Sequence, residues 1–226
     1  MDSNLTSPPR QPATRTVAIL LFDGVELLDF AGPFEVFYAA RLARGPVRET
    51  SDAPALFRVL TLGRSEGAVE VRGGLHVTPH FSLEKAPPVQ ILVVPGGQGT
   101  RSLLEDREFL DSIRSMASEA KLVASVCTGA LLLAKAGLLK NRRATTHWAS
   151  LDLLASIDPT TEIDASARVV DDGVFTCGGI SAGIDLALCI VEKLCGKDVA
   201  DDTARHIDYR SPWWVARHTS VGSAGA

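Results

Sequence analysis

Residues 121–139 read KLVASVCTGALLLAKAGLL and contain a single chemically reactive turn. A short apolar segment leads into a turn at Cys127, and leucines and alanines, which favour helix, follow it. A cysteine at a strand-to-helix turn lies beside the free N–H groups and the positive dipole end of the helix, and both favour thiolate over thiol. The same kind of turn presents the serine of α/β hydrolases. The stretch therefore predicts a nucleophile elbow with Cys127 at its tip.

Predicted strands and helices alternate along the chain on both sides of this elbow. Residues 17–22 (VAILLF) and 90–94 (QILVV) are continuous apolar runs, as expected of parallel strands covered on both faces. Further strands are predicted at 56–62 and 143–146, hairpins at 69–77 and 169–175, and helices at 26–43, 102–119, 148–156, 181–194 and 198–206. This alternation predicts an α/β sandwich with a mainly parallel central sheet.

Length and composition fit one globular unit. The chain has 226 residues, of which 46% are hydrophobic, and this is enough for a single large core. Residues 1–15 are polar and rich in proline, serine and threonine, so we expect a disordered leader there. One domain is expected at 16–212 and a loose tail at 213–226.

Charge and cysteine spacing argue against several classes of partner. The formal net charge is −4 and no long run of lysine or arginine occurs, so neither nucleic acid nor a membrane surface is expected as a partner. No apolar run is long enough to cross a bilayer, and the N-terminus lacks the apolar segment of a secretory signal. The four cysteines show neither a CxxC pair nor zinc spacing. We therefore expect a cytoplasmic protein without a metal site.

Chemically useful residues follow several of the predicted strands. In open parallel sheets the ligand site lies at the carboxyl ends of the strands. Asp29, Gly96-Gly97, Cys127 and His147 each come after a predicted strand. The structural alternatives are a helix N-cap for Asp29, a plain turn for the glycines, a packed side chain or helix cap for His147, and an inert buried thiol for Cys127. Their convergence on one sulfur favours a functional site.

Five blocks, in this order and spacing, resemble the ThiJ/PfpI superfamily of cysteine-elbow proteins. They are FDGVELLDFAGPFEVF, VVPGGQGT, VASVCTGALLLAKAGLL, ATTHW and CGGISAGIDLAL, and the resemblance covers residues 16–211. It is strongest to the isonitrile hydratase branch, through LLDFAGP, SVCTGALLL, RATTHW and GGISAGID. It implies a three-layer sandwich of the flavodoxin-like, class I glutamine amidotransferase-like kind, and a homodimer. A related branch, the sensing domain of transcription regulators, continues into a helix-turn-helix region; this chain stops at Ala226, which argues against that branch.

The resemblance assigns roles to residues around the elbow. It implies that Cys127 is the nucleophile and that the carboxyl group of Asp29 faces its sulfur. The backbone N–H groups of Gly97 and Thr128 are implied to line an anion-binding pocket, where negative charge would develop. Protease-like members place a histidine directly after the cysteine. Here that residue is Thr128, so a protease dyad of adjacent residues is absent.

Three further positions bear on the same pocket. Ile180 matches an apolar position near the cysteine and is expected to shape the pocket. His147 remains as a distal base. Cys177 stands where the hydratase pattern has a glycine, so a bulkier side chain adjoins the site.

The implied activity is cysteine-dependent hydration of isonitriles to N-substituted formamides through a covalent thioimidate, without a metal or organic cofactor. The expected partner is thus a small-molecule isonitrile or another small electrophile. One alternative is glyoxalase- or deglycase-like activity on methylglyoxal, although that class generally has glutamate at the position of Asp29. The other is a redox sensor in which Cys127 is oxidised to a sulfinic acid stabilised by Asp29.

Overall fold

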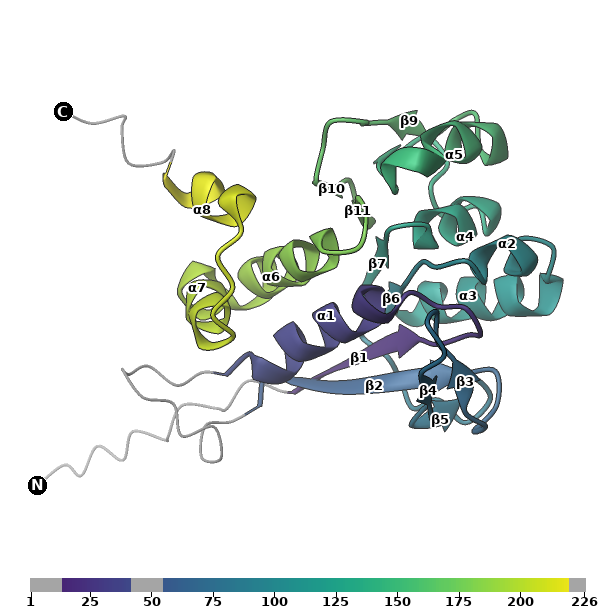
Figure 1. Ribbon diagram of the computed structural model, residues 1–226, viewed down its shortest axis with the longest axis horizontal. Coiled ribbons are helices and arrows are strands. Elements are labelled where there is room, and N and C mark those ends of the chain that lie inside the picture. The colour runs from purple at the N-terminus through teal and green to yellow at the C-terminus, as the bar shows by residue number, and fades with distance from the viewer. Residues whose placement is uncertain (1–13, 42–54, 220–226) are drawn as a thin grey trace, which may run out of the picture.

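The computed structural model describes residues 14–41 and 55–219, and a seven-stranded sheet forms its centre (Figure 1). Most of the predicted leader at 1–15 lies outside the described residues, and Arg15 already belongs to the first strand. The strand order is β10-β11-β7-β6-β1-β2-β5. The strands are β1 (Arg15–Leu20), β2 (Phe57–Gly63), β5 (Phe81–Ser82), β6 (Ile91–Val94), β7 (Leu122–Val126), β10 (Val169–Asp171) and β11 (Phe175–Cys177). All pairs are parallel except β10 with β11.

Helices cover both faces of this sheet. Helices α1 (Leu27–Ala39), α6 (Ala182–Cys195) and α7 (Lys197–His206) pack together as one group. The other group contains α2 (Thr100–Leu103), α3 (Arg107–Glu119), α4 (Gly129–Lys135) and α5 (Leu151–Ile157). Right-handed crossovers place the two groups on opposite faces, because the chain moves one way along the sheet after β1 and the other way after β6. The predicted three-layer α/β sandwich with a mainly parallel sheet is confirmed.

Local signals explain where the observed elements differ from the predicted ones. The helix predicted at 102–119 is divided into α2 and α3, because the Asp106 side chain accepts a hydrogen bond from the N–H of Phe109 at 3.0 Å and starts a new helix. The helix predicted at 148–156 begins as a 3₁₀ turn, η1 (Trp148–Ser150), before α5. Both predicted hairpins are present, the first as β3 (Val69–Glu70) with β4 (His76–Val77) and the second as β10 with β11.

The strand predicted at 143–146 does not join the central sheet. Only β8 (Arg143–Ala144) forms, and it pairs with β9 (Glu162–Ile163) in a separate two-stranded sheet. The two residues after β8 form hydrogen bonds to other segments in place of sheet pairing. The Thr145 N–H donates to Thr176 Oγ1 at 2.9 Å, and Thr146 Oγ1 donates to the Cys127 carbonyl at 2.8 Å. These bonds still bring the segment before His147 to the elbow.

The loose tail predicted from residue 213 begins instead as a helix, α8 (Pro212–Thr219). Ser211 and Pro212 form a helix start, since the Trp214 N–H donates to Ser211 Oγ at 2.9 Å and proline suits the first helical position. Trp214 is only 4% exposed and joins the hydrophobic core. The aromatic side chain therefore holds the end of the described chain against the domain.

A buried carboxylate links this C-terminal segment to α6. Asp185 is fully buried and accepts hydrogen bonds from Arg168 Nε at 2.6 Å, Tyr209 Oη at 2.9 Å and Ser211 Oγ at 2.8 Å. A buried charge is tolerated only when it is paired and hydrogen-bonded, and these three donors meet that need.

Replacing Asp185 by alanine should destabilise the fold strongly. The change removes three hydrogen bonds and leaves Arg168, whose side chain is 30% exposed, without its carboxylate. We expect the free energy of unfolding to fall by about 2–4 kcal/mol in a denaturant titration. Asp111→Ala is the matched control, because Asp111 pairs with Arg114 at the surface and its loss should cost less than about 1 kcal/mol. Equal losses in the two variants would contradict the anchoring role of Asp185.

Candidate active site

The predicted strand–turn–helix is present around Cys127, between β7 and α4. Cys127 has a φ of 55°, a left-handed conformation that is costly for any residue other than glycine. Two hydrogen bonds hold it there: its N–H donates to the Gly178 carbonyl at 3.1 Å, and its own carbonyl accepts from Thr146 Oγ1. At Gly129 a Cβ would overlap the Val94 carbonyl, so α4 can start this close to β6 only with glycine there. The elbow is therefore imposed by its neighbours.

Asp29 lies in the first turn of α1 and is fully buried. Its Oδ2 accepts a hydrogen bond from the Gly96 N–H at 2.9 Å, whereas its Oδ1 makes no hydrogen bond within the described residues. The N-cap residue of the helix is Glu26, so the capping alternative for Asp29 is wrong. A Cβ on Gly96 would lie 2.8 Å from Asp29 Oδ2 and 2.5 Å from the Thr128 nitrogen. Glycine at this position is thus a requirement of the site and more than a turn signal.

The Asp29 carboxyl and the Cys127 thiol titrate as a coupled pair. Burial raises the pKa of Asp29 from its usual 3.8 to about 7; the Gly96 N–H and the Cys127 side chain lower it, and the charge of Glu26 raises it. Burial, and after it the charge of Asp29, raises the pKa of Cys127 from 9.0 to about 12. Burial and the charge of Asp29 therefore outweigh the helix N-terminus, which was expected to favour the thiolate. When Asp29 keeps its proton, its charge no longer opposes the thiolate, so one proton is shared by the pair.

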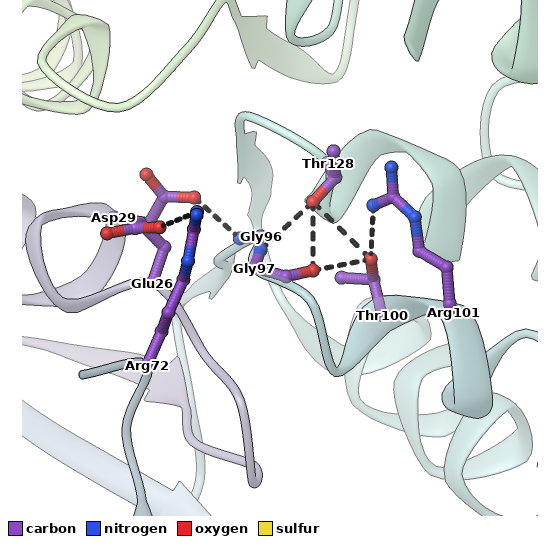
Figure 2. Close-up of polar contacts among 8 residues, drawn as sticks. All are labelled: Glu26, Asp29, Arg72, Gly96, Gly97, Thr100, Arg101 and Thr128. Carbon is purple, nitrogen blue, oxygen red and sulfur yellow. Dashed lines mark hydrogen bonds and ion pairs between the residues drawn. The ribbon is translucent and has the colours of Figure 1, made fainter. Parts of the chain in front are cut away.

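The donors near the sulfur differ from the expected pair. The N–H groups of Ile180 and Thr128 both lower the pKa of Cys127 through hydrogen bonds. The Gly97 N–H, expected as a donor to bound anions, instead donates to Thr128 Oγ1 at 3.0 Å (Figure 2). Ile180 has a φ of 41°, so its backbone is also left-handed, and it acts through its N–H as well as its apolar side chain. The only sequence signal for this was the glycine pair that precedes it.

His147 follows β8 and lies at the wall of the pocket. Its Nδ1 accepts a hydrogen bond from the Ala149 N–H at 3.3 Å, so it caps η1 as one structural alternative proposed. A neutral ring that accepts at Nδ1 carries its proton on Nε2 and can donate there, but cannot take a proton there. A Cβ added to Gly179 would lie 3.1 Å from Nε2, so the ring packs directly on this glycine. His147 thus combines a cap with a place beside the elbow.

A pocket of about 250 Å³ opens beside the Cys127 elbow, and the fully buried Asp29 is not among the residues that line it. The predicted residues Gly97, Cys127, Thr128, His147 and Ile180 all line it. The lining residues that sequence reasoning missed are Glu26, Arg72, Gln98, Arg101, Ala149 and Ser150. Glu26 and Gln98 lie inside the quoted blocks but were given no role there, whereas Arg72 of the β3–β4 hairpin and Arg101 of α2 lie outside every block.

Cys177 is fully buried at the end of β11, where it pairs in register with Val126 of β7. Burial raises the pKa of its thiol well above the usual value, so it is held as a neutral thiol behind the elbow. The side chain that replaces the expected glycine therefore belongs to the core.

Within residues 14–41 and 55–219, no group of three or more histidine, cysteine, aspartate or glutamate side chains is placed to hold a metal ion. None of the helices in these ranges has both the length and the apolar character needed to span a bilayer.

A cysteine elbow facing a buried carboxyl group, at the carboxyl ends of a parallel sheet between two helical layers, is the arrangement that the resemblance implied. A family model described as the DJ-1/PfpI family matches residues 15–193. The chain belongs to this family, which confirms the ThiJ/PfpI resemblance.

Individual relatives differ in what they are named for. The chain is 39% identical to an isonitrile hydratase of Pseudomonas putida over 85% of this chain and 78% of that protein. It is 28% identical to the transcriptional regulator GbdR of Pseudomonas aeruginosa, over 85% of this chain but only 50% of the regulator.

Solved structures agree on the fold. A ThiJ/PfpI family protein from Pseudomonas syringae superposes with a TM-score of 0.76 at 27% identity, covering 93% of this chain and 85% of that one. Drosophila melanogaster DJ-1beta gives a TM-score of 0.74 at 22% identity, covering 88% and 100%, and supports the fold alone.

The raised pKa of Asp29 should make wild-type stability depend on pH in a predictable direction. Between pH 3.8 and about 7 the folded state keeps a proton that the unfolded state has lost, so stability falls as pH rises through this window. Asp29→Asn has no such proton. The variant should therefore gain stability relative to wild type between pH 4 and pH 8, by up to about 4 kcal/mol.

Denaturant titrations of both proteins across this range measure the difference. Asp111→Asn, an exposed aspartate, serves as the control and should show no comparable gain. A difference between Asp29→Asn and wild type that stays constant with pH would contradict the raised pKa.

Proposed function

We propose that this protein hydrates isonitriles to N-substituted formamides, with Cys127 as nucleophile and Asp29 as acid and base. The observation that carries the proposal is the arrangement of a buried, protonatable carboxyl group beside an elbow thiol whose sulfur accepts N–H bonds from Thr128 and Ile180. The 39% identity to an isonitrile hydratase supports the same reaction.

The reaction proceeds in two covalent steps. The Cys127 thiolate forms a carbon–sulfur bond to the terminal carbon of R–N≡C, and the Asp29 proton goes to that same carbon, giving the thioimidate R–N=CH–S–Cys. Asp29, now a carboxylate, takes a proton from water as the hydroxyl adds to the imidate carbon, and passes that proton to the nitrogen. The carbon–sulfur bond then breaks as the hydroxyl proton is transferred to the sulfur, so R–NH–CHO leaves and the Cys127–Asp29 pair again holds one proton. The sum is one isonitrile plus one water.

The environment of Asp29 suits both of its tasks. A general acid–base catalyst works best when its pKa lies near the working pH, and burial raises the pKa of Asp29 to about 7. The Gly96 N–H binds Oδ2, so Oδ1 is the oxygen left to carry the proton. Because His147 accepts at Nδ1 and the Glu26 carboxylate is paired with Arg72, we assign the proton transfer from water to Asp29, which adjoins Cys127 although it does not itself line the pocket.

Neither alternative is favoured by a separate observation. Oxidation of a cysteine proceeds through its thiolate, as the proposed hydration does, so the raised pKa of Cys127 does not separate the two reactions. Aldehyde chemistry on methylglyoxal uses the same sulfur and remains an outcome to be measured beside hydration.

Substitution of the two central residues tests the proposal. Purified wild-type protein should convert p-nitrophenyl isocyanide to its formamide, Cys127→Ala should abolish turnover, and Asp29→Asn should lower kcat by roughly 10²-fold or more. Cys195→Ala, which alters a half-buried cysteine outside the pocket, is the matched control and should keep wild-type activity. Methylglyoxal is assayed in parallel with lactate as the product. Lactate without formamide, or full activity in Cys127→Ala, would sink the scheme.

Homodimer formation stays a prediction. Of the aromatic residues on α1, Phe37 is fully buried and packs against Phe57, so it belongs to the core. Tyr38 is 57% exposed, and Leu27 and Leu28 near the start of the helix are 41% and 38% exposed. These side chains give α1 an apolar outer face of the kind found at interfaces.

A further inference from the structure

Of the two arginines that line the Cys127 pocket, one is paired with a carboxylate and the other is not. Arg72 donates from its guanidinium to Glu26 Oε2 at 2.8 Å, so these two opposite charges compensate each other. Arg101 lines the same pocket and forms no ion pair with any described residue. Figure 2 shows the two arginines on opposite sides of Gly97, with the carboxyl groups of Glu26 and Asp29 both on the Arg72 side.

Arg101 is nevertheless held in place by hydroxyl groups. One terminal nitrogen donates to Thr100 Oγ1 at 2.9 Å and the other to Ser150 Oγ at 3.1 Å. Both partners are buried, with Thr100 fully covered and Ser150 3% exposed. A guanidinium carries five N–H donors, and these two bonds use only part of them. The side chain is therefore oriented by neutral groups while its charge and its remaining donors stay available.

Thr100, which accepts a hydrogen bond from Arg101, also contacts residues of the elbow. Thr100 Oγ1 donates to the Gly97 carbonyl at 2.8 Å and lies 3.4 Å from Thr128 Oγ1 (Figure 2). Thr128 directly follows Cys127. Through this pair of threonine hydroxyls, the cation is held in a fixed relation to the residue beside the reacting sulfur.

We propose that the pocket selects an isonitrile that carries a carboxylate group, and that Arg101 binds this carboxylate. The inference rests on the proposed function, because it names the substrate class of the same site. Hydration of a neutral isonitrile needs no cation at the pocket rim. A planar guanidinium matches a carboxylate in a bidentate manner, and such charge-assisted bonds are stronger than neutral ones.

Matched pairs of substrates test the inference: isocyanoacetate with its ethyl ester, and 4-isocyanobenzoate with its methyl ester. The readout is the ratio of kcat/KM for the acid to kcat/KM for the ester. Wild type should prefer at least one acid, and Arg101→Met should lower this acid-to-ester ratio by roughly 10- to 100-fold, mainly through KM for the acid. Arg101→Lys should restore part of the ratio.

Arg64→Met provides the control, because Arg64 is half exposed, pairs with Asp106 and Glu108, and does not line the pocket. Its acid-to-ester ratio should equal that of wild type. A merely structural Arg101, tying α2 to Ser150, would lower kcat/KM for acid and ester alike and leave the ratio unchanged. Should Arg101→Met prove unstable, wild type alone serves: raising ionic strength from about 0.01 M to about 0.1 M should lower the ratio.

The outcomes separate this inference from the proposed function. Hydration of both members of each pair, with the same ratio in wild type and Arg101→Met, overturns carboxylate selection and leaves isonitrile hydration standing. A ratio that falls in Arg101→Met and recovers in Arg101→Lys supports the inference. Absence of formamide from every isonitrile, neutral or acidic, overturns both.

Discussion

The hydrogen bond from the Gly96 N–H to Asp29 Oδ2 determines how the rest of the site works. It supplies one stabilising partner to a carboxyl group that is otherwise wholly removed from water, and it leaves Oδ1 without a hydrogen-bond partner among the described residues. Neither partner tolerates much change. A side chain on Gly96 would collide with both Asp29 and the Thr128 backbone, and burial keeps the carboxyl protonated to about pH 7. A single backbone donor thereby joins the geometry of α1, β6 and the elbow.

The pKa of Cys127 is not set by its position at a helix N-terminus alone. The Thr128 and Ile180 N–H groups favour the thiolate, yet burial and the nearby carboxylate raise the pKa of Cys127 by more. A lone thiol in such a place would be unreactive. Paired with an acid that retains its proton near neutrality, the same thiol can share one charge with its neighbour. The chemistry thus belongs to the pair, and the proton is placed where the proposed hydration would first need it.

Patterns along the chain predicted those parts of the molecule that depend on local sequence. The apolar runs predicted β1 and β6, and the turn at Cys127 together with the family resemblance predicted the elbow and Asp29. What escaped prediction depends on contacts between distant segments. The Gly97 N–H donates to a threonine hydroxyl from another segment, Ile180 contributes through its backbone, and β8 pairs with β9 outside the central sheet. Arg101 belongs to no sequence motif, and its proposed role depends on the absence of a carboxylate partner for it among the described residues.

The left-handed backbone at Cys127 has a consequence for how the protein matures. Its N–H and carbonyl are secured by Gly178 and Thr146, residues about fifty and twenty positions further along the chain, and the N–H of Ile180 arrives with the first of these segments. No nascent fragment that ends at the elbow can therefore assemble the pocket. The left-handed turn at Cys127 is complete only after these later segments have docked on it.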